Sequence, residues 1–275
     1  MQPFGARLRL AMDRRGQLCV GIDPHAALLS AWGLDDNPAG LESFALTCVE
    51  ALAADVAVLK PQSAFFERHG AAGIGVLEKT VAAARDAGAL VLLDAKRGDI
   101  GSTMQGYAEA YLDQSSPMAV DAMTVSPYLG FESLRPVLDM ARTHGAGVFV
   151  LARTSNPGGP DVQHAVSSVG TVAATMLVAI AAENEGAEPM GSVGAVVAAN
   201  LSDCAEDLAV NGPLLAPGYG AQGGGPDDLQ RIFAGVEGLV LPSTSREVLG
   251  AGPSALALRD AALRSIDTVR LALTH

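Results

Sequence analysis

Eight short runs of apolar residues recur along the chain, and most show no alternation of apolar and polar positions. Strands buried on both faces of a parallel sheet have this pattern. The predicted strands are Leu18–Ile22, Val56–Leu59, Ala89–Leu93, Ala122–Val125, Val148–Leu151, Gly194–Ala198, Leu214–Ala216 and Leu239–Leu241. Longer segments with helical patterns lie between them. The predicted helices are Leu41–Ala54, Gly75–Ala87, Met104–Leu112, Ser133–Thr143, Thr171–Glu185, Pro226–Phe233 and Ser254–Leu273.

This alternation predicts eight strand–helix units, which fit an α/β fold: a closed (β/α)8 TIM barrel in a single domain over residues 1–275. An open doubly wound sheet is the main competitor. It is disfavoured because the first strand leads into Asp23-Pro24 rather than a G-x-G-x-x-G turn. The segment Thr154–Gly170 is long and polar and contains Gly and Pro, so we expect an extended loop there, and such loops are often functional lids.

Polar residues cluster where the predicted strands end. In a barrel these carboxyl ends converge on one face, where active sites are built. The positions are Asp23, Lys60, Asp94, Ser126, Arg153, Asn200, Gly218 and Ser243. Their shared placement predicts a site at that face.

Composition and charge narrow the classes of partner. Hydrophobic residues make up 49% of the chain and aromatic residues 4%, which is typical of an α/β protein packed through small aliphatic side chains. The net charge of −12 disfavours nucleic acid and anionic membranes as partners. No signal-peptide pattern or membrane-length apolar run is present, so we expect a cytoplasmic protein. Cys19, Cys48 and Cys204 lack C-x-x-C spacing and are interpreted as reduced packing residues.

The sequence Asp94-Ala-Lys96-Arg97-Gly-Asp99 places two acids and two bases directly after a predicted buried strand. Asp94 and Lys96 are two residues apart, so on an extended strand end they point to the same side. Lys60 ends the preceding strand and would lie next to them. Opposite charges at short range keep both lysines ionised, and a fixed ammonium is a good proton donor to a carbanion. A buried ion-pair network that only holds loops is the alternative, but clustered titratable groups in a cleft favour an active site.

A second group of residues suits an anion. The run Pro217-Gly-Tyr-Gly-Ala-Gln222-Gly-Gly-Gly225 precedes a predicted helix, and glycine-rich turns let backbone N–H groups approach phosphate. Arg246 follows the eighth strand and offers a planar fork for phosphate oxygens. Because barrels often hold phosphate after strands seven and eight, phosphate binding is favoured over a plain turn.

These residues resemble one known family. Asp94-Ala-Lys96-x-x-Asp99 looks like the D-x-K-x-x-D signature of the orotidine 5'-phosphate decarboxylases, and the segments from Pro217 and at Ser245-Arg246 resemble that family's phosphate-binding segments. Lys60-Pro-Gln-Ser-Ala-Phe-Phe-Glu67 and Arg153-Thr-Ser155-Asn-Pro-Gly158 look like its longer bacterial subgroup. The matches run in order from Asp23 to Arg246, over nearly the whole predicted barrel.

The resemblance implies decarboxylation of orotidine 5'-monophosphate to UMP in pyrimidine biosynthesis, without a metal or organic cofactor. Lys96 would protonate C6 of the pyrimidine, Asp94 would face the departing carboxylate, and Lys60 would contact the ribose. Asp99 and Thr103 would reach into the partner subunit's site, which implies a homodimer with shared sites. The implied substrate contacts are Asp23 at the ribose, Ser155 at the pyrimidine, and Pro217, Gln222 and Arg246 at the phosphate.

Two other functions stay open. One is a related barrel with the same acid–base array, a metal-dependent sugar-phosphate lyase or synthase. The other is a nucleotide-phosphate binding protein without catalysis, against which the intact Lys60, Asp94, Lys96 and Asp99 argue. The sequence leaves the orientation of Arg97 and the role of Asn200 undecided. His25 and Glu67 are expected to have supporting rather than catalytic roles.

Overall fold

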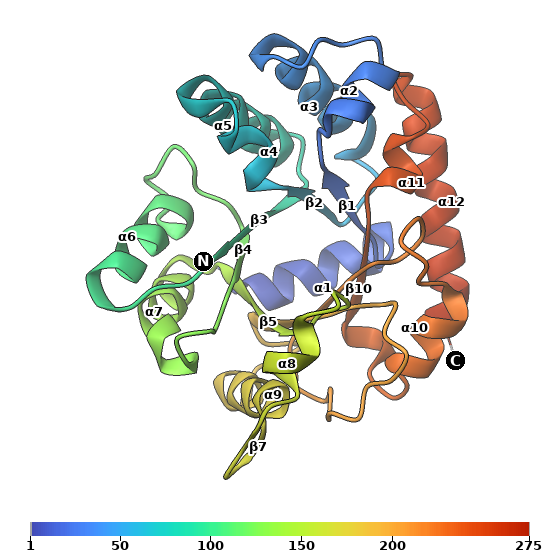
Figure 1. Cartoon of the computed structure of the whole chain (residues 1–275). Helices are drawn as coiled ribbons and strands as arrows, with labels where there is room; N and C mark the ends of the chain where they lie inside the picture. Colours follow the sequence, from blue (N-terminus) through green and yellow to red (C-terminus); the bar gives the residue numbers. More distant parts are fainter. Residues whose placement is uncertain (1, 275) are drawn as a thin grey trace.

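A closed barrel of eight parallel strands forms the centre of the computed structural model, which describes residues 2–274 (Figure 1). The strands follow one another around the barrel in the order β1, β10, β9, β8, β5, β4, β3, β2. Their bounds are β1 Cys19–Ile22, β2 Val58–Pro61, β3 Leu90–Arg97, β4 Ala122–Val125, β5 Gly147–Arg153, β8 Val193–Val197, β9 Leu214–Pro217 and β10 Val240–Thr244. The predicted TIM-barrel fold and its eight strands are confirmed.

An outer ring of helices surrounds the barrel (Figure 1). The helices that were predicted are α3 Pro38–Leu52, α5 Gly70–Asp86, α6 Gly101–Leu112, α7 Arg135–His144, α9 Val172–Glu183, α10 Pro226–Ile232 and α12 Ala255–Leu273. Short helices follow several strands; they are α2 Ala26–Ala31, α4 Ser63–Glu67, α8 Gly159–Gln163 and α11 Arg246–Leu249. Among the described residues, no helix is both long enough and apolar enough to cross a bilayer.

The eight predicted strand–helix units are incomplete at one place, between the sixth and seventh strands, where the predicted helices also leave a gap. Residues 198–213, between β8 and β9, form no helix. The buried Asn184 side chain holds this connection instead: its Nδ2 donates to the carbonyl oxygens of Val193 (2.7 Å) and Val210 (2.9 Å). One amide side chain thus ties this connection to the start of β8. In the other strand–helix units, a packed helix connects the strands.

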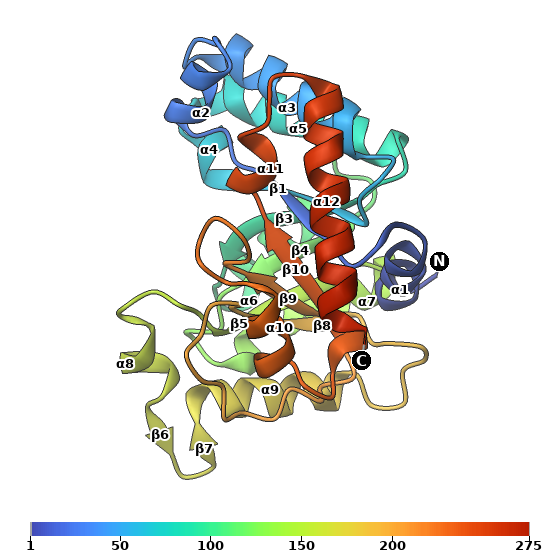
Figure 2. The same cartoon turned by 90° about the vertical axis from the view of Figure 1, so that its right-hand side faces the viewer.

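The segment Thr154–Gly170 is also more structured than predicted. It contains α8 and most of a two-stranded hairpin formed by β6 (Val166–Ser167) and β7 (Gly170–Thr171). Figure 2 shows α8 and this hairpin extending from the same side of the barrel. The prediction failed because strands of two residues leave no periodic pattern in a sequence.

The helix α1 (Phe4–Arg15) closes the other end of the barrel and was not predicted (Figure 2). Its buried side chains Phe4, Leu8 and Met12 follow helical spacing and pack against residues inside the barrel. The Phe4 ring packs edge-on against Phe149 of β5, with 6.0 Å between ring centroids. A Cβ atom on Gly147 would lie 2.2 Å from the Phe4 ring, so this contact requires glycine. Because α1 fills the amino-terminal end, only the carboxyl ends of the strands are open for a site.

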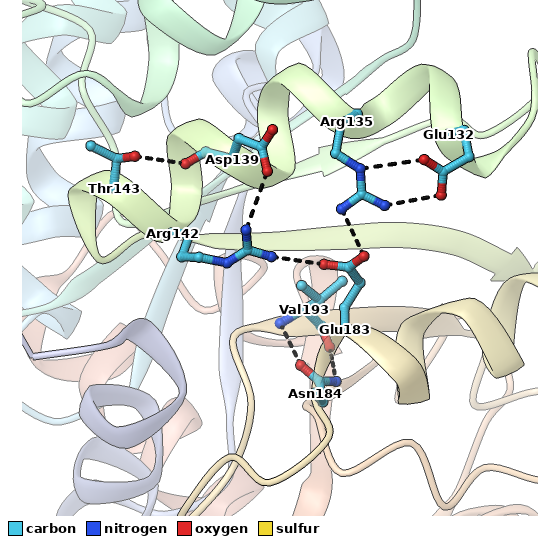
Figure 3. A network of polar contacts seen from close by, with 8 residues as sticks. All are labelled: Glu132, Arg135, Asp139, Arg142, Thr143, Glu183, Asn184 and Val193. Carbon is cyan, nitrogen blue, oxygen red and sulfur yellow. Dashed lines mark hydrogen bonds and ion pairs between the residues drawn. The ribbon is translucent and has the colours of Figure 1, made fainter.

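An ion-pair network joins α7 and α9 in the outer ring (Figure 3). Glu183 is the last residue of α9, where a negative charge opposes the helix dipole. Two arginines of α7 compensate for it: Arg135 donates to Oε1 (2.8 Å) and Arg142 to Oε2 (3.1 Å). The network therefore fastens α9 at the amino-terminal side of the barrel, away from the strand ends that carry the predicted site residues.

Candidate active site

Three charged side chains meet at the carboxyl ends of β2 and β3. The carboxylate of Asp94 lies between two lysines, with Lys60 Nζ 3.2 Å from Oδ2 and Lys96 Nζ 2.6 Å from Oδ1. The Lys60 and Asp94 side chains are 8% and 11% exposed, whereas the Lys96 side chain is 45% exposed. The predicted contact of Lys60, Asp94 and Lys96 is therefore present, and only the Lys96 ammonium reaches well into solvent.

The backbone around Lys96 is not a regular extended strand. In the β3–β4 ladder Leu93 pairs with Met123 and Arg97 pairs with Val125, so three residues of β3 face one residue of β4. Within this bulge Lys96 has a φ of 47°, in the left-handed region. The sequence predicted that Asp94 and Lys96 meet because alternate side chains of an extended strand point to the same side. They meet instead because the chain bulges.

Thr124 of β4 faces this bulge and was not among the predicted site residues. Its Oγ1 donates to Asp94 Oδ1 (2.9 Å) and accepts from the backbone N–H of Lys96 (3.0 Å). The sequence signal was present, since Thr124 is the one polar residue in the run Ala122–Val125. Ser126, the polar residue predicted at this strand end, lies two residues further on.

The array keeps its charges at neutral pH. Burial by itself disfavours the carboxylate of Asp94, but the attraction of Lys60 and Lys96 outweighs it, so the pKa of Asp94 lies well below its usual range. Burial likewise disfavours the Lys60 ammonium, but Asp94 and Asp23 outweigh it and raise the pKa of Lys60 above its ordinary value. The site therefore presents a fixed carboxylate and a fixed ammonium to whatever binds beside it.

Asp23 follows β1 and is the second acidic group near Lys60. Its Oδ1 is buried and has no hydrogen-bond partner among the described residues. The carboxylate lies close to the backbone of β1, because a Cβ atom on Gly21 would be 3.1 Å from Asp23 Oδ2. An unpartnered buried carboxylate oxygen is a free acceptor, which suits a ligand hydroxyl.

Arg97 points away from the array. Its guanidinium pairs with Glu67 of α4 and lies over the Tyr107 ring, 5.4 Å from the centroid. Glu67 in turn accepts a hydrogen bond from Ser63 Oγ. A cavity of about 120 Å³ lies here, lined by Gln62, Ser63, Ala64, Glu67, Asp94, Ala95, Lys96 and Arg97. Arg97 and Glu67 thus join α4 to β3 and support the site without belonging to the charged array.

Asp99 does not join this array within the described chain. Its Oδ1 accepts a hydrogen bond from the backbone N–H of Ile100 (2.8 Å), and no ion pair links it to Lys60 or Lys96 among the described residues. Thr103 is exposed on the first turn of α6. Among the described residues, the charged array of one chain therefore consists of Lys60, Asp94 and Lys96. That Asp99 serves the partner subunit's site, as the resemblance implies, stays a prediction.

The glycine-rich run after β9 folds into a compact loop. Gly218, Gly220 and Gly223 have φ values of 91°, 77° and 98°, which favour glycine. Backbone bonds close the loop, from Gly220 N to Gly224 O (2.8 Å) and from Gly224 N to Gly218 O (3.0 Å). Pro217 pairs in register with Ser243 of β10, which brings the loop beside the segment that leads to Arg246.

Asn200 supports this loop from the end of β8. Its Nδ2 donates to the backbone carbonyl oxygen of Gln222 (3.1 Å), and a Cβ atom on Gly218 would lie 2.6 Å from its Oδ1. The side chains of Gln222 and Arg246 are exposed. Two predicted phosphate contacts are thus free to take a ligand, while Asn200, whose role the sequence left undecided, holds the loop in place.

The predicted pyrimidine contact Ser155 is exposed in the segment after β5. The start of this segment is fixed at two points. Gln163 of α8 accepts from the Thr154 N–H (3.0 Å), and Arg153 forms a buried ion pair with Glu206. Ser155 therefore follows a rigid strand end and has a free hydroxyl at the open end of the barrel.

Comparison with known proteins places this architecture in one family. Residues 16–261 match the model of the orotidine 5'-phosphate decarboxylase / HUMPS family. The chain is 62% identical to the orotidine 5'-phosphate decarboxylase of Streptomyces coelicolor, covering 100% of this chain and 99% of that protein. It is 60% identical to the protein of that name from Nocardioides sp., covering 98% and 100% of the two chains.

Solved structures agree with these matches. A crystal structure from Streptomyces avermitilis superposes with a TM-score of 0.97 at 62% identity, over 99% of this chain and 96% of that chain. The orotidine monophosphate decarboxylase of Leishmania donovani superposes with a TM-score of 0.77 at 26% identity, over 99% of both chains. On the family match over most of its length and on these full-length relatives, the chain belongs to the orotidine 5'-phosphate decarboxylase / HUMPS family.

Proposed function

We propose that the protein decarboxylates orotidine 5'-monophosphate to UMP, with Lys96 as the proton donor to C6. The observation that carries the proposal is the buried Asp94 carboxylate held between Lys60 and Lys96. The overall reaction is the one for which the full-length relatives are named, so the chain is an enzyme of the carboxy-lyase class in pyrimidine biosynthesis.

The chemistry follows from the charges. The bond between C6 and the carboxylate breaks, carbon dioxide leaves, and the electron pair left on C6 takes a proton from Lys96 Nζ. Asp94 supports this step in two ways, because it faces the substrate carboxylate with a like charge and fixes the Lys96 ammonium. Lys60 keeps Asp94 ionised, and we assign to it a contact with the ribose. The protein's own charges carry the step, and no cofactor has a role in it.

The substrate contacts extend from the array to the glycine-rich loop. The free Asp23 carboxylate oxygen suits a ribose hydroxyl, and the Ser155 hydroxyl suits the pyrimidine edge. The 5'-phosphate would bind Gln222, Arg246 and the turn that begins at Pro217. Arg246 is well suited because a planar guanidinium binds phosphate oxygens in pairs.

A homodimer with shared sites is part of the proposal. Asp99 and Thr103 lie beside exposed apolar side chains, with Ile100 62%, Tyr128 79% and Leu129 53% exposed. The two loops that carry them touch, since a Cβ atom on Gly98 would lie 2.3 Å from the carbonyl oxygen of Ser126. An apolar patch next to a carboxylate that forms no ion pair among the described residues is what a subunit interface supplying Asp99 to its neighbour requires. A cytoplasmic location is supported by the three free cysteines.

One assay tests the function against its two rivals. Chelator-treated protein is mixed with orotidine 5'-monophosphate, and the loss of orotidylate absorbance is followed. We expect full turnover with chelator, and none with Lys96→Ala. Turnover that requires added Mg²⁺ would favour the metal-dependent lyase or synthase. A folded protein that binds UMP but gives no turnover would be the non-catalytic binding protein.

A further inference from the structure

Thr124 is a buried polar side chain in the interior of the barrel wall. It is 1% exposed, and its neighbours in β4 are Ala122, Met123 and Val125. A buried hydroxyl has to be hydrogen-bonded. The Thr124 hydroxyl makes both of its contacts to the catalytic segment of β3.

These two contacts connect the Asp94 carboxylate to the proton donor Lys96. Thr124 Oγ1 donates a hydrogen bond to Asp94 Oδ1 (2.9 Å) and accepts one from the Lys96 N–H (3.0 Å). Asp94 Oδ1 is also the oxygen that binds Lys96 Nζ. One hydroxyl thus fixes the carboxylate at one end and the backbone of the donor lysine at the other.

The Lys96 backbone needs such a partner. Its φ of 47° is unfavourable for a residue with a side chain, and such conformations persist only where the surroundings hold them. The bulge between Leu93 and Arg97 also takes the Lys96 N–H out of the regular ladder with β4. The Thr124 hydroxyl replaces the missing ladder acceptor, so the left-handed turn that aims Lys96 at Asp94 depends on it.

We propose that Thr124 is a positioning residue for the decarboxylation, acting through Asp94 and Lys96 without contacting the substrate. The proposal rests on the function proposed above, because it assigns those two residues to the reaction. It implies that loss of the hydroxyl slows the chemical step while leaving nucleotide binding nearly intact. UMP lacks the carboxylate that Asp94 faces, so its affinity reports binding without the chemical step.

The test compares variants that differ by the hydroxyl alone. Thr124→Val keeps the branched shape and loses the hydroxyl, while Thr124→Ser and Thr124→Ala form a second pair with and without it. We expect kcat to fall by about tenfold to a hundredfold in the Val and Ala variants, as for a small misplacement of reacting groups. KM for orotidylate and Kd for UMP should stay within about threefold, and Thr124→Ser should recover most of kcat. Thr80→Val removes a buried hydroxyl of α5 that bonds only within its own helix, to the Val76 carbonyl oxygen, and should leave kcat unchanged.

Each outcome decides one point. Equal kcat in Thr124→Ser and Thr124→Ala, or an unchanged kcat in Thr124→Val, overturns the role of the hydroxyl. A parallel loss of kcat and UMP affinity overturns positioning and indicates a general disturbance of the pocket. If Thr124→Val does not fold, the Ser and Ala pair decides alone. Wild-type protein without orotidylate turnover overturns the proposed function and the inference with it, whereas wild-type turnover with unaffected variants overturns the inference only.

Discussion

Arg153 and Glu206 form a buried ion pair, with side chains only 6% and 7% exposed. Arg153 is the last residue of β5, and Glu206 lies in the connection between β8 and β9 that has no helix. Arg153 also donates to the backbone carbonyl oxygen of Asp203 (3.3 Å). The pair therefore anchors an otherwise irregular connection to the strand end that precedes Ser155.

Glu206→Ala should destabilise the protein strongly, because it leaves the buried Arg153 guanidinium with only the exposed Asp203 carboxylate, 3.7 Å away, as a counter-charge. Breaking a buried pair in this way costs about 3–5 kcal/mol. Urea unfolding measures the loss. The exposed Lys79–Glu42 pair provides the control, since Glu42→Ala should cost less than about 1 kcal/mol. Similar losses in the two variants would contradict the anchoring role of Glu206.

Arg246→Ala should weaken substrate binding and leave the chemistry nearly intact. Charge-assisted hydrogen bonds contribute about 1.5–3 kcal/mol each, so KM should rise by roughly tenfold to a hundredfold. Steady-state kinetics with orotidylate measure the effect, and the nucleoside orotidine, which has no phosphate, should show no difference between variant and wild type. Arg259→Ala, which removes an exposed arginine of α12 paired with Asp55, is the matched control. A kcat loss without a change in KM would refute phosphate binding by Arg246.

Asn200→Ala should loosen the glycine-rich loop. It removes the hydrogen bond to the Gln222 carbonyl oxygen and the side chain that packs against Gly218. We expect KM for orotidylate to rise by about fivefold to tenfold, in line with the loss of one hydrogen bond of about 1 kcal/mol. The melting temperature should change little, because the part of the loop that Asn200 holds, residues 221–223, is exposed. An unchanged KM would show that the loop keeps its shape without Asn200.

Asp94 should make the protein acid-sensitive. Its folded-state pKa lies below that of the unfolded chain, so the unfolded state binds more protons and stability rises with pH. The contribution is complete above about pH 5 and is lost as pH falls through 4 toward the folded-state pKa. The difference in unfolding free energy between wild type and Asp94→Asn should therefore shrink by up to about 1.4 kcal/mol per unit below pH 4. Urea titrations from pH 6 to 3.5 measure it, and a constant difference would contradict the depressed pKa.

The sequence was sufficient for the barrel because buried parallel strands are apolar throughout and long amphipathic helices carry a strong period. It was insufficient where structure depends on single contacts. Asn184 holds the helix-free segment after β8, and α1 closes the barrel through Phe4 against Gly147. Neither contact leaves a pattern in a single sequence.

The same limit applies to the site. Lys60, Asp94 and Lys96 could be predicted to meet because strand ends converge in a barrel. The bulge at Lys96 and the hydroxyl of Thr124 could not, because a left-handed lysine has no local sequence signal. The direction of the Arg97 side chain could not be predicted either, since it depends on an ion pair with Glu67 in a separate helix.

The proposed sharing of sites between subunits gives the last prediction. Lys96→Ala loses the proton donor of its own site, and Asp99→Ala loses the carboxylate supplied to the partner's site, so each homodimer should be inactive. When the two proteins are mixed and exchange subunits, a heterodimer has one site with both defects and one site with neither. Mixing should therefore restore activity to about a quarter of the wild-type value under random exchange. Exchange is verified with differently tagged chains, and Lys96→Ala mixed with itself gives the baseline. No recovery despite verified exchange would place Asp99 outside the neighbouring site, while high activity of Asp99→Ala alone would show that the reaction does not need it.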